Sequence, residues 1–385
     1  MLGFVARRLL QGVLTLWVIA SLAFGLMRLA PGGPFDKEKP LPPAVAANLK
    51  RTFGLAVDIG SPLAGVVVGC AVKAGTVVDE GAPLCTVQPA AGPVVYLRAD
   101  RALTVVAVVG APGRTVEAGA VLVVRDTSGW EQYVASLGSW LRLDLGVTYA
   151  SEGERTVMEV LGKAFPVSLE LGLLALGLAL ALGLSAGLTA GLHRNTWIDH
   201  GLMTLALAAV SLSSLVLAPL LLALFGVTLQ WLPWGGWEAG SWDAAHARVK
   251  VLPVVTLGLV YAAYFARLAR AGLLDVLSQD FIRTARAKGL SEFRVVTRHA
   301  LRGALLPVVS FLGPALAGIV TGSVVIERVF AVPGVGEYFV NAAVNRDYPL
   351  VMGTVVLYSS LLIVSNLAVD VAYAALDPRV RVHDD

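Results

Sequence analysis

Charged side chains are scarce in this sequence. Only 15% of its 385 residues are charged, whereas 56% are hydrophobic, and the net charge is +3. Because soluble globular domains carry about 25% charged residues, this composition argues against a soluble domain and indicates a membrane protein. The small net charge gives no support for binding to nucleic acid.

Residues that hold metals, cofactors or nucleotides are also few. The chain has two cysteines and five histidines, without the spacing of a CxxC or HExxH site. A phosphate-binding loop of the form GxxxxGK[ST] is missing, since Gly162-Lys163 is followed by Ala164. The sequence therefore predicts no catalytic residues, no cofactor, no metal site and no enzymatic activity.

Long apolar runs are what the sequence has in abundance. Runs of about 20 residues are long enough to cross a bilayer as helices, whose backbone groups are satisfied internally. The first run follows Arg7 and Arg8 as in a signal peptide, but it continues to Leu26 without a cleavage site and is interpreted as a retained span. The sequence predicts an α-helical polytopic membrane protein with six transmembrane helices, near residues 9–30, 165–192, 201–225, 251–274, 304–326 and 350–376.

Basic residues in the short loops predict the orientation, because they gather on the cytoplasmic side of a membrane. They lie before the first predicted span, after the second, fourth and sixth, and most densely in the loop after the fourth. We expect a multi-pass protein of the plasma (inner) membrane, embedded in the lipid bilayer, with both termini cytoplasmic. Residues 31–160, 226–250 and 327–349 are then extracytoplasmic.

Two of these outer segments carry tryptophans. Trp231, Trp234, Trp237 and Trp242 lie in the 226–250 loop. An aromatic belt at the membrane surface is the ordinary interpretation, and a role in receiving substrate is the alternative. The 130–141 segment has apolar residues at three- and four-residue spacing, which predicts an amphipathic helix on the outer surface.

Residues 57–128 differ from the rest and contain an internal repeat. A pattern of glycines and apolar residues recurs 38 residues later, as Gly75, Val78, Gly81 and Leu84 followed by Gly113, Val116, Gly119 and Leu122. Each copy predicts two short strands around a glycine turn. The sequence therefore predicts a small all-β domain in which the two halves close on each other.

With Ser61-Pro62-Leu63-Ala64-Gly65 before it, this repeat resembles the barrel-sandwich domains that carry biotin or lipoate. The resemblance implies the fold but not the modification, because the hairpin Gln88-Pro89-Ala90-Ala91-Gly92 has no lysine and Lys73 lies elsewhere. A structural or docking insert is favoured over a prosthetic-group carrier. Cys70 and Cys85 form either a disulfide, which an oxidising compartment permits, or two buried apolar positions.

The segment Asp280–Leu290 resembles the cytoplasmic "EAA" loop of ABC importer permeases. Arg283 replaces the glutamate, as in the dipeptide and oligopeptide branch, and Arg302 stands at the later proline position. The resemblance makes 276–302 an ATPase-coupling loop, whose short helix and glycine turn would pass motion into the spans. The coupling residues it implies are Arg283, Thr284, Ala285, Lys288, Gly289, Leu290 and Glu292.

Further stretches resemble permeases of the oligopeptide family. They are Ala30–Phe35, Lys39–Pro43, Phe53-Gly54-Leu55, Trp130–Tyr133, Leu143–Gly146, Thr228–Pro233, Phe330–Gly336, Asn345–Pro349 and Leu376–Arg379. The resemblance implies a first helix and loop start in 1–56, an inserted β-domain in 57–128, and a surface helix with five spans in 129–385. It also implies a heterodimer with a second permease subunit, two cytoplasmic ATPase subunits that bind the ATP, and an extracytoplasmic substrate-binding protein.

Candidate residues of the external gate follow from the same motifs: Glu327, Pro333, Gly334, Gly336 and Asp347. For Glu327 and Arg28, near external span ends, snorkelling or a local ion pair is the ordinary explanation and substrate contact the alternative. The function predicted is import of oligopeptides or dipeptides through an ATP-driven permease. One alternative keeps this architecture for oligosaccharides or metal chelates, and another is a membrane-anchored docking or carrier protein that acts through its β-domain.

Overall fold

A computed structural model describes residues 2–29, 43–142, 144–151, 154–322 and 324–376. The chain divides into two compact units, which are treated separately below. The first contains residues 1–21, 160–341 and 353–385, and the second contains 22–159 and 342–352. The motif stretches at 30–35 and 39–42, and the basic residues Arg379 and Arg381, lie outside the described residues.

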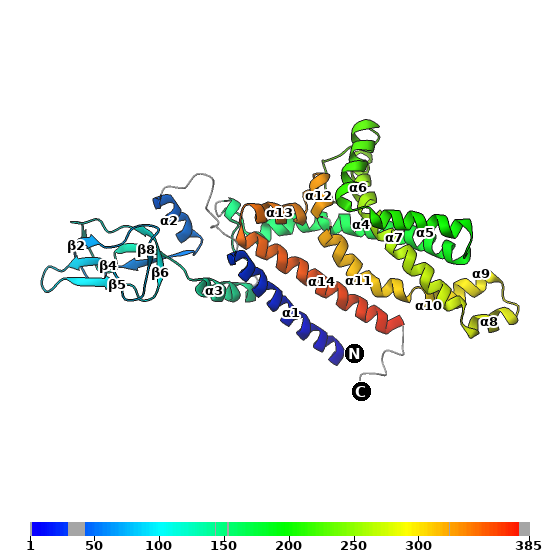
Figure 1. Ribbon diagram of the computed structural model, residues 1–385, viewed down its shortest axis with the longest axis horizontal. Coiled ribbons are helices and arrows are strands. Elements are labelled where there is room, and N and C mark those ends of the chain that lie inside the picture. The colour runs from blue at the N-terminus through cyan, green and yellow to red at the C-terminus, as the bar shows by residue number, and fades with distance from the viewer. Residues whose placement is uncertain (1, 30–42, 143, 152–153, 323, 377–385) are drawn as a thin grey trace. The chain divides into compact units, whose positions relative to one another are not determined.

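The first unit is helical (Figure 1), and some of its helices continue into the second unit. Its longest elements are α1 (Leu2–Leu29), α4 (Val157–Leu192), α7 (Ala244–Leu277), α11 (Leu306–Gly322) and α14 (Tyr348–Leu376). The shorter elements are α5 (Trp197–Ser211), α6 (Ser214–Leu221), the π-helical η2 (Leu222–Thr228), α8 (Asp280–Ala287), α9 (Glu292–Arg294), the π-helical η3 (Val295–Ala300), α10 (Leu301–Ala304), α12 (Val324–Val329) and α13 (Val335–Val344).

Five helical stretches of the described chain are long and apolar enough to cross a membrane. They are Arg7–Leu29, Val157–Leu192, Ala244–Leu277, Leu306–Val329 and Tyr348–Val369. The expectation of one continuous helix over 201–225 is wrong, because α5 and the α6–η2 helix meet at a bend of 100°. Leu212 is extended, and the Ser213 hydroxyl accepts a hydrogen bond from the Leu215 amide, which starts a new helix there. The total is six only if this bent pair counts as one span.

Glycines bring the helices of the first unit into backbone contact. A Cβ on Gly187 would lie 2.3 Å from the carbonyl oxygen of Ala266, which joins α4 to α7. A Cβ on Gly272 would lie 2.3 Å from the carbonyl oxygen of Ala304, which joins α7 to α10. Such approaches are typical of helices packed without a hydrophobic force between them, as the small residues of the sequence predict.

The second unit contains the β-domain. Its strands are β1 (Ala56–Gly60), β2 (Gly65–Cys70), β3 (Val77–Val78), β4 (Pro83–Gln88), β5 (Val95–Arg98), β6 (Leu103–Val108), β7 (Thr115–Val116) and β8 (Val121–Asp126). They form two four-stranded sheets, in the orders β1-β8-β6-β3 and β5-β4-β2-β7. When each of the strands β1–β4 is replaced by its counterpart in β5–β8, and the reverse, the order of the first sheet becomes the order of the second. The sequence repeat is therefore also a structural repeat. The first and last strands pair, with Ala56 opposite Asp126.

The core of the β-domain answers the question left open for the cysteines. Cys70 and Cys85 form a disulfide between the paired strands β2 and β4. The repeat places Val108 and Val123 at the equivalent positions, and these valines also pair, between β6 and β8. Fully buried valines and leucines fill the space between the sheets: Val67, Leu84, Val87, Leu122 and Val123.

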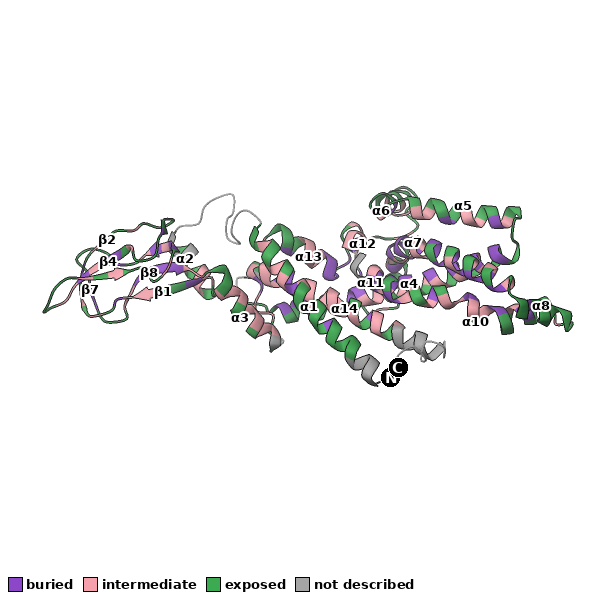
Figure 2. Cartoon of the chain, turned by 60° about the horizontal axis from the view of Figure 1, so that its bottom comes forward, coloured by how far each residue is buried: buried purple, intermediate pink, exposed green. Residues whose placement is uncertain are grey.

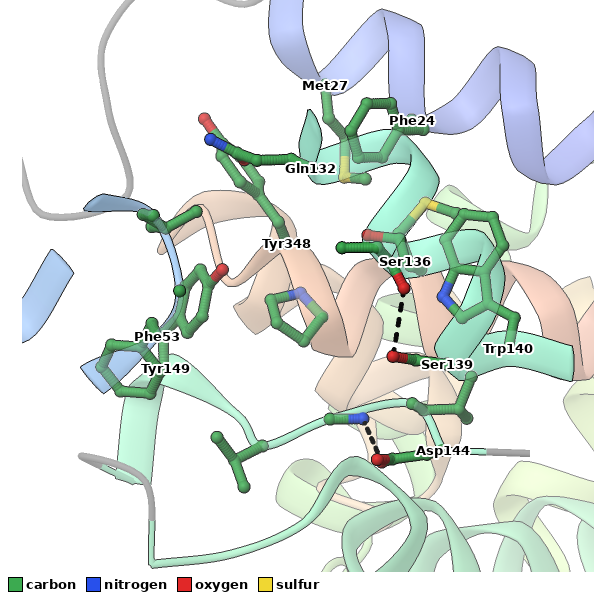
Figure 3. A pocket seen from close by; sticks show the side chains of 18 of the residues that line it. Phe24, Met27, Phe53, Gln132, Ser136, Ser139, Trp140, Asp144, Tyr149 and Tyr348 are labelled. Carbon is green, nitrogen blue, oxygen red and sulfur yellow. Dashed lines mark hydrogen bonds between the residues drawn. The ribbon is translucent and has the colours of Figure 1, made fainter. Parts of the chain in front are cut away.

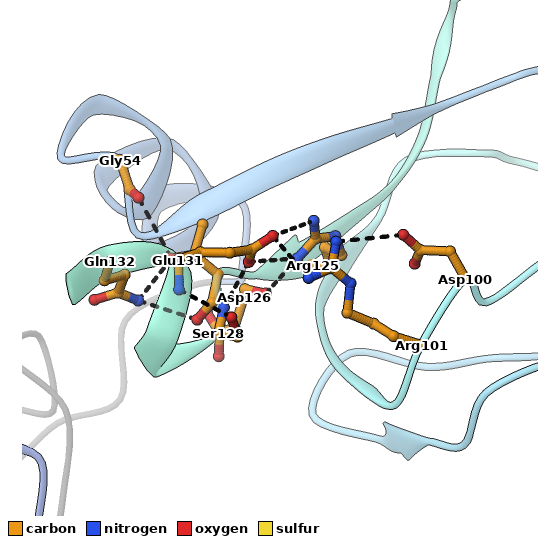
Figure 4. Close-up of polar contacts among 9 residues, drawn as sticks. Gly54, Asp100, Arg101, Arg125, Asp126, Ser128, Glu131 and Gln132 are labelled. Carbon is orange, nitrogen blue, oxygen red and sulfur yellow. Dashed lines mark hydrogen bonds and ion pairs between the residues drawn. The ribbon is translucent and has the colours of Figure 1, made fainter. Parts of the chain in front are cut away.

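Helices α2 (Pro43–Thr52) and α3 (Gly129–Leu141) flank the β-domain, and α3 confirms the helix predicted at 130–141. Ser128 and Glu131 form a capping box at the start of α3. Glu131 also binds Arg125 of β8 through two hydrogen bonds, at 3.2 and 3.3 Å (Figure 4). The Arg125 hydrogen bonds hold the pKa of the Glu131 carboxyl at about 2, below its usual value of 4.5.

Candidate functional site

The segment 276–302 folds back on the end of α7. Its short helix α8 buries Ile282 and Ala285 and leaves its other face exposed. The buried pair packs in a cluster with residues of α7, η3 and α10, which are Leu273, Val276, Val295, Ala300 and Ala304. Ala285 therefore packs against its own chain.

A glycine turn ends α8. The Lys288 amide donates to the carbonyl of Thr284 at 3.1 Å, and Gly289 follows with a φ of +77°. A Cβ at Gly289 would meet no atom within 4 Å. The position therefore requires glycine for its left-handed backbone conformation and not for space.

The tip of this segment presents cations and aromatic rings. Arg283 and Lys288 are exposed, as are Phe281 and, at 77% of its surface, Phe293. Figure 2 shows α8 largely in the colour of exposed residues. Of the seven predicted coupling residues, five are exposed, Ala285 is buried and Leu290 is half-buried. Arg286, which the sequence analysis did not single out, binds the predicted Glu292 at 2.7 and 3.2 Å.

Three of the five predicted gate residues gather around one carboxylate. Glu327 of α12 is fully buried and accepts hydrogen bonds from the Ser168 hydroxyl and the Gly336 amide, both at 2.7 Å. The Ser168 hydroxyl in turn accepts from the Val335 amide at 2.8 Å. Snorkelling of Glu327 to the surface is therefore wrong, because its carboxylate ties α4 to the turn that begins α13.

The glycines of that turn are needed for space. A Cβ on Gly334 would lie 2.5 Å from the Glu327 carboxyl carbon and equally close to the Ser168 hydroxyl oxygen. A Cβ on Gly336 would lie 2.6 Å from the Cα of Val324. Pro333 is exposed beside them. The motif Pro-Gly-Val-Gly therefore lets the chain pass directly over the buried carboxylate.

Asp347 belongs to the second unit and is not part of this group. Its buried carboxylate accepts a short hydrogen bond from the Thr148 hydroxyl, together with bonds from the amides of Ala150 at 3.0 Å and Leu350 at 3.2 Å. These bonds tie the loop around Tyr149 to the turn that precedes α14. Asp347 therefore fixes backbone geometry.

Sequence reasoning missed a buried cation beside the tryptophan loop. Lys250 is 3% exposed and donates to Glu170 at 2.7 Å and to the carbonyl of Ser241 at 2.8 Å. Its ammonium lies 4.3 Å from the ring centre of Trp242 and 5.3 Å from that of Trp237. Trp237 is buried and does not belong to an aromatic belt, whereas Trp231, Trp234 and Trp242 are exposed. The sequence signal that could have indicated this buried cation was Lys250 itself, a lysine at the start of an apolar run.

Similarity to known proteins identifies the family of this chain. Residues 179–382, which include the segment 276–302, Glu327 and the turn at 333–336, match the family described as the binding-protein-dependent transport system inner membrane component. The chain belongs to this family of transport permeases. Family membership makes it a membrane subunit of a transport system.

Individual members of the family are similar over the whole chain. The oligopeptide transport system permease protein OppB of Haemophilus influenzae is 36% identical, over 99% of this chain and 100% of that protein. The protein of the same name from Salmonella typhimurium is 37% identical over the same shares. The dipeptide transport system permease protein DppB of Bacillus subtilis is 34% identical, over 100% of this chain and 99% of that protein.

Proposed function

We propose that this chain is the membrane-spanning permease subunit of an ATP-driven importer of oligopeptides or dipeptides. The observation that carries the proposal is the similarity to two kinds of peptide permease along nearly the full length of both chains. A match limited to the helical core would support the architecture alone. The described residues of this chain supply a path and a coupling surface, and the chemical energy comes from partner subunits.

The segment 276–302 is the surface that we propose for the ATPase subunits. Its exposed Arg283 and Lys288 suit carboxylates on a partner, and its exposed Phe281 and Phe293 suit an apolar groove. The buried Ile282 and Ala285 link the tip to α7, so a push on the tip moves a spanning helix. A second, similar permease subunit completes the path, and an extracytoplasmic binding protein delivers the substrate.

Both termini and the segment 276–302 are cytoplasmic in this proposal, and the β-domain is extracytoplasmic. The Cys70–Cys85 disulfide supports that side, because disulfides persist in oxidising compartments. We infer that the β-domain is a barrel-sandwich module for docking. Its hairpin at 89–92 carries no lysine, and the exposed Lys73 lies between β2 and β3.

Uptake of labelled tri- to pentapeptides, in cells with and without this gene, tests the proposal. We expect gene-dependent peptide uptake that requires ATP. Labelled oligosaccharides and metal chelates are the control cargoes, and uptake of these alone would reassign the substrate while keeping the permease. The mass of the intact protein tests the carrier alternative, which a biotin or lipoyl adduct on residues 57–127 would revive.

A matched deletion tests the role of the β-domain. Ala56 and Asp126 pair across neighbouring strands, so removal of residues 57–127 leaves ends that a short linker joins. We expect the shortened chain to insert into the membrane with its spans intact. Loss of insertion would show that the β-domain is part of the permease fold itself.

A further inference from the structure

The second unit contains a cavity of about 300 Å³, and none of the predicted coupling and gate residues is among the residues that line it. The C-terminal end of α1, the end of α2, α3, the 144–149 loop and the start of α14 all contribute to its wall. Aromatic side chains form much of this wall (Figure 3): Phe24, Phe53, Trp140, Tyr149 and Tyr348. We call this cavity the aromatic pocket.

One end of the aromatic pocket is positively charged. Arg28 lines it, with its guanidinium 5.3 Å from the ring centre of Phe24. Within the described chain, no carboxylate pairs with Arg28. The nearby Asp126 carboxylate is instead bound by the ammonium of Lys50, at 2.9 and 3.2 Å. Arg28 is exposed, and a guanidinium beside an apolar wall is suited to a carboxylate or phosphate oxygen.

The other end of the aromatic pocket is negatively charged. Asp144 lines it and accepts a hydrogen bond from the Gly146 amide at 2.9 Å. Figure 3 places Asp144 beside Ser139, well apart from Phe24 across the drawn pocket. Opposite charges at two ends of a small aromatic cavity match a zwitterion with an apolar side chain.

The walls between these ends are fixed by bonds already described. Thr148 and Ala150, on either side of Tyr149, both bind the Asp347 carboxylate, and Tyr348 follows Asp347 directly. The Tyr149 ring packs against Phe53, with ring centres 4.6 Å apart. Burial raises the pKa of the Tyr149 phenol, which keeps its hydroxyl protonated. Asp347 is therefore a positioning residue for the pocket.

We propose that the aromatic pocket binds a dipeptide, with the dipeptide carboxylate on Arg28, an apolar side chain against the aromatic walls and the terminal ammonium toward Asp144. The proposal rests on the proposed function, since it names a peptide site on this subunit. The volume, at the low end for ligand pockets, suits one or two residues and not a long chain.

Binding of the labelled dipeptide Ala-Phe and its C-terminal amide to the full-length chain, in phosphatidylcholine nanodiscs, tests this site. We expect the free acid to bind at least about tenfold more tightly than the amide, because only the acid offers a carboxylate to Arg28. Arg28→Gln should weaken binding of the acid by a similar factor and abolish the preference for it. Asp144→Asn should instead reduce the preference for a free over an acetylated amino terminus.

Arg7→Gln is the matched control, because it removes the same charge from the other end of α1 and should change neither preference. Equal binding of acid and amide by the unaltered protein would overturn the proposal, and this comparison needs no variant to fold. Loss of peptide binding in phosphatidylethanolamine nanodiscs would also overturn it, by assigning the pocket to a lipid headgroup. Gene-dependent peptide uptake without acid preference would remove this site and leave the proposed function intact.

Discussion

Arg270 of α7 binds both carboxylate oxygens of Asp199 of α5, at 2.6 and 2.7 Å. Asp199 is 1% exposed, and this pair joins the first half of the bent α5–α6 segment to α7, the most buried of the five long apolar helices of the described chain. The same carboxylate accepts from the Asn195 amide at 3.0 Å, which fixes the turn before α5. The Asp199–Arg270 pair therefore holds the start of α5 against α7.

Removing one partner of that pair should destabilise the protein strongly. We expect Arg270→Gln to lower the free energy of unfolding by about 3 kcal/mol, because it leaves a buried carboxylate without its cation. The double variant Asp199→Asn with Arg270→Gln should recover part of this loss. Unfolding by heat in detergent gives the measurement. Arg283→Gln, which removes an exposed pair 3.6 Å long, is the control and should change little.

Gly289 should tolerate asparagine better than other residues. Its φ of +77° is accessible to asparagine and aspartate, whereas alanine is strained there by about 1 kcal/mol or more, and aspartate also adds a negative charge to a tip that presents Arg283 and Lys288. We expect the Gly289→Asp variant to reach the membrane. Its partner subunits should still hydrolyse ATP, but this hydrolysis should no longer drive peptide transport. Gly289→Asn should keep most of the coupling. Full transport by the aspartate variant would remove the coupling role from this turn.

Gly334 should not tolerate even a methyl group. Because its Cβ would lie 2.5 Å from Glu327 and Ser168, we expect Gly334→Ala to reduce stability by about 1–3 kcal/mol and to reduce transport. Gly201→Ala, on α5 with no atom near its Cβ, should be neutral or slightly stabilising. Thermal unfolding and peptide uptake of both variants provide the comparison. Equal behaviour of the two alanines would contradict the crowding described around Glu327.

The contribution of the disulfide can be tested by replacing it with the residues at the equivalent positions in the second copy of the internal repeat. Cys70→Val with Cys85→Val installs the pair that the repeat uses at Val108 and Val123. A link across a loop of about 15 residues contributes about 3 kcal/mol, so the valine pair should destabilise the β-domain by somewhat less than that. Cys70→Ser with Cys85→Ser should destabilise it more, because it adds polar groups to the core. Hydrogen exchange of the β strands in the full-length chain distinguishes the two.

Acid should loosen the junction between β8 and α3. The pKa of Glu131 is about 2 when folded and about 4.5 when unfolded, so its contribution is complete above about pH 4.5 and is lost as the pH falls toward 2. We expect a loss of about 1–2 kcal/mol over that range, given that solvent screens a side chain 31% exposed. Glu131→Gln should remove this pH dependence. Amide exchange at residues 126–132, compared at pH 2.5 and 6, measures it.

Local patterns in the sequence predicted much of this fold. The apolar runs located the five long spanning helices, and the repeat anticipated two equivalent halves of a β-domain. The break between α5 and α6 was missed because Ser211, Ser213 and Ser214, which can end one helix and start another, were taken as part of one apolar run. Periodicity reports burial, and a change of direction within an apolar stretch leaves no trace in it.

Partners distant in sequence were beyond such reasoning. Ser168 lies 159 residues from Glu327, and a serine in an apolar helix gives no sign of which carboxylate it meets. Lys250 and Glu170 pair across 80 residues for the same reason. The sequence motif singled out Gly334, but the steric need for glycine there became visible only with the buried carboxylate beneath it.

The arrangement of the β-domain also constrains its biogenesis. Each sheet combines strands from both copies of the repeat, and the first strand finds its partner only in the last, where Ala56 meets Asp126. Neither copy can close alone. If the domain lies outside, the whole segment must cross the membrane before any of it folds, and an exported half-domain would present unpaired strands to proteases and chaperones.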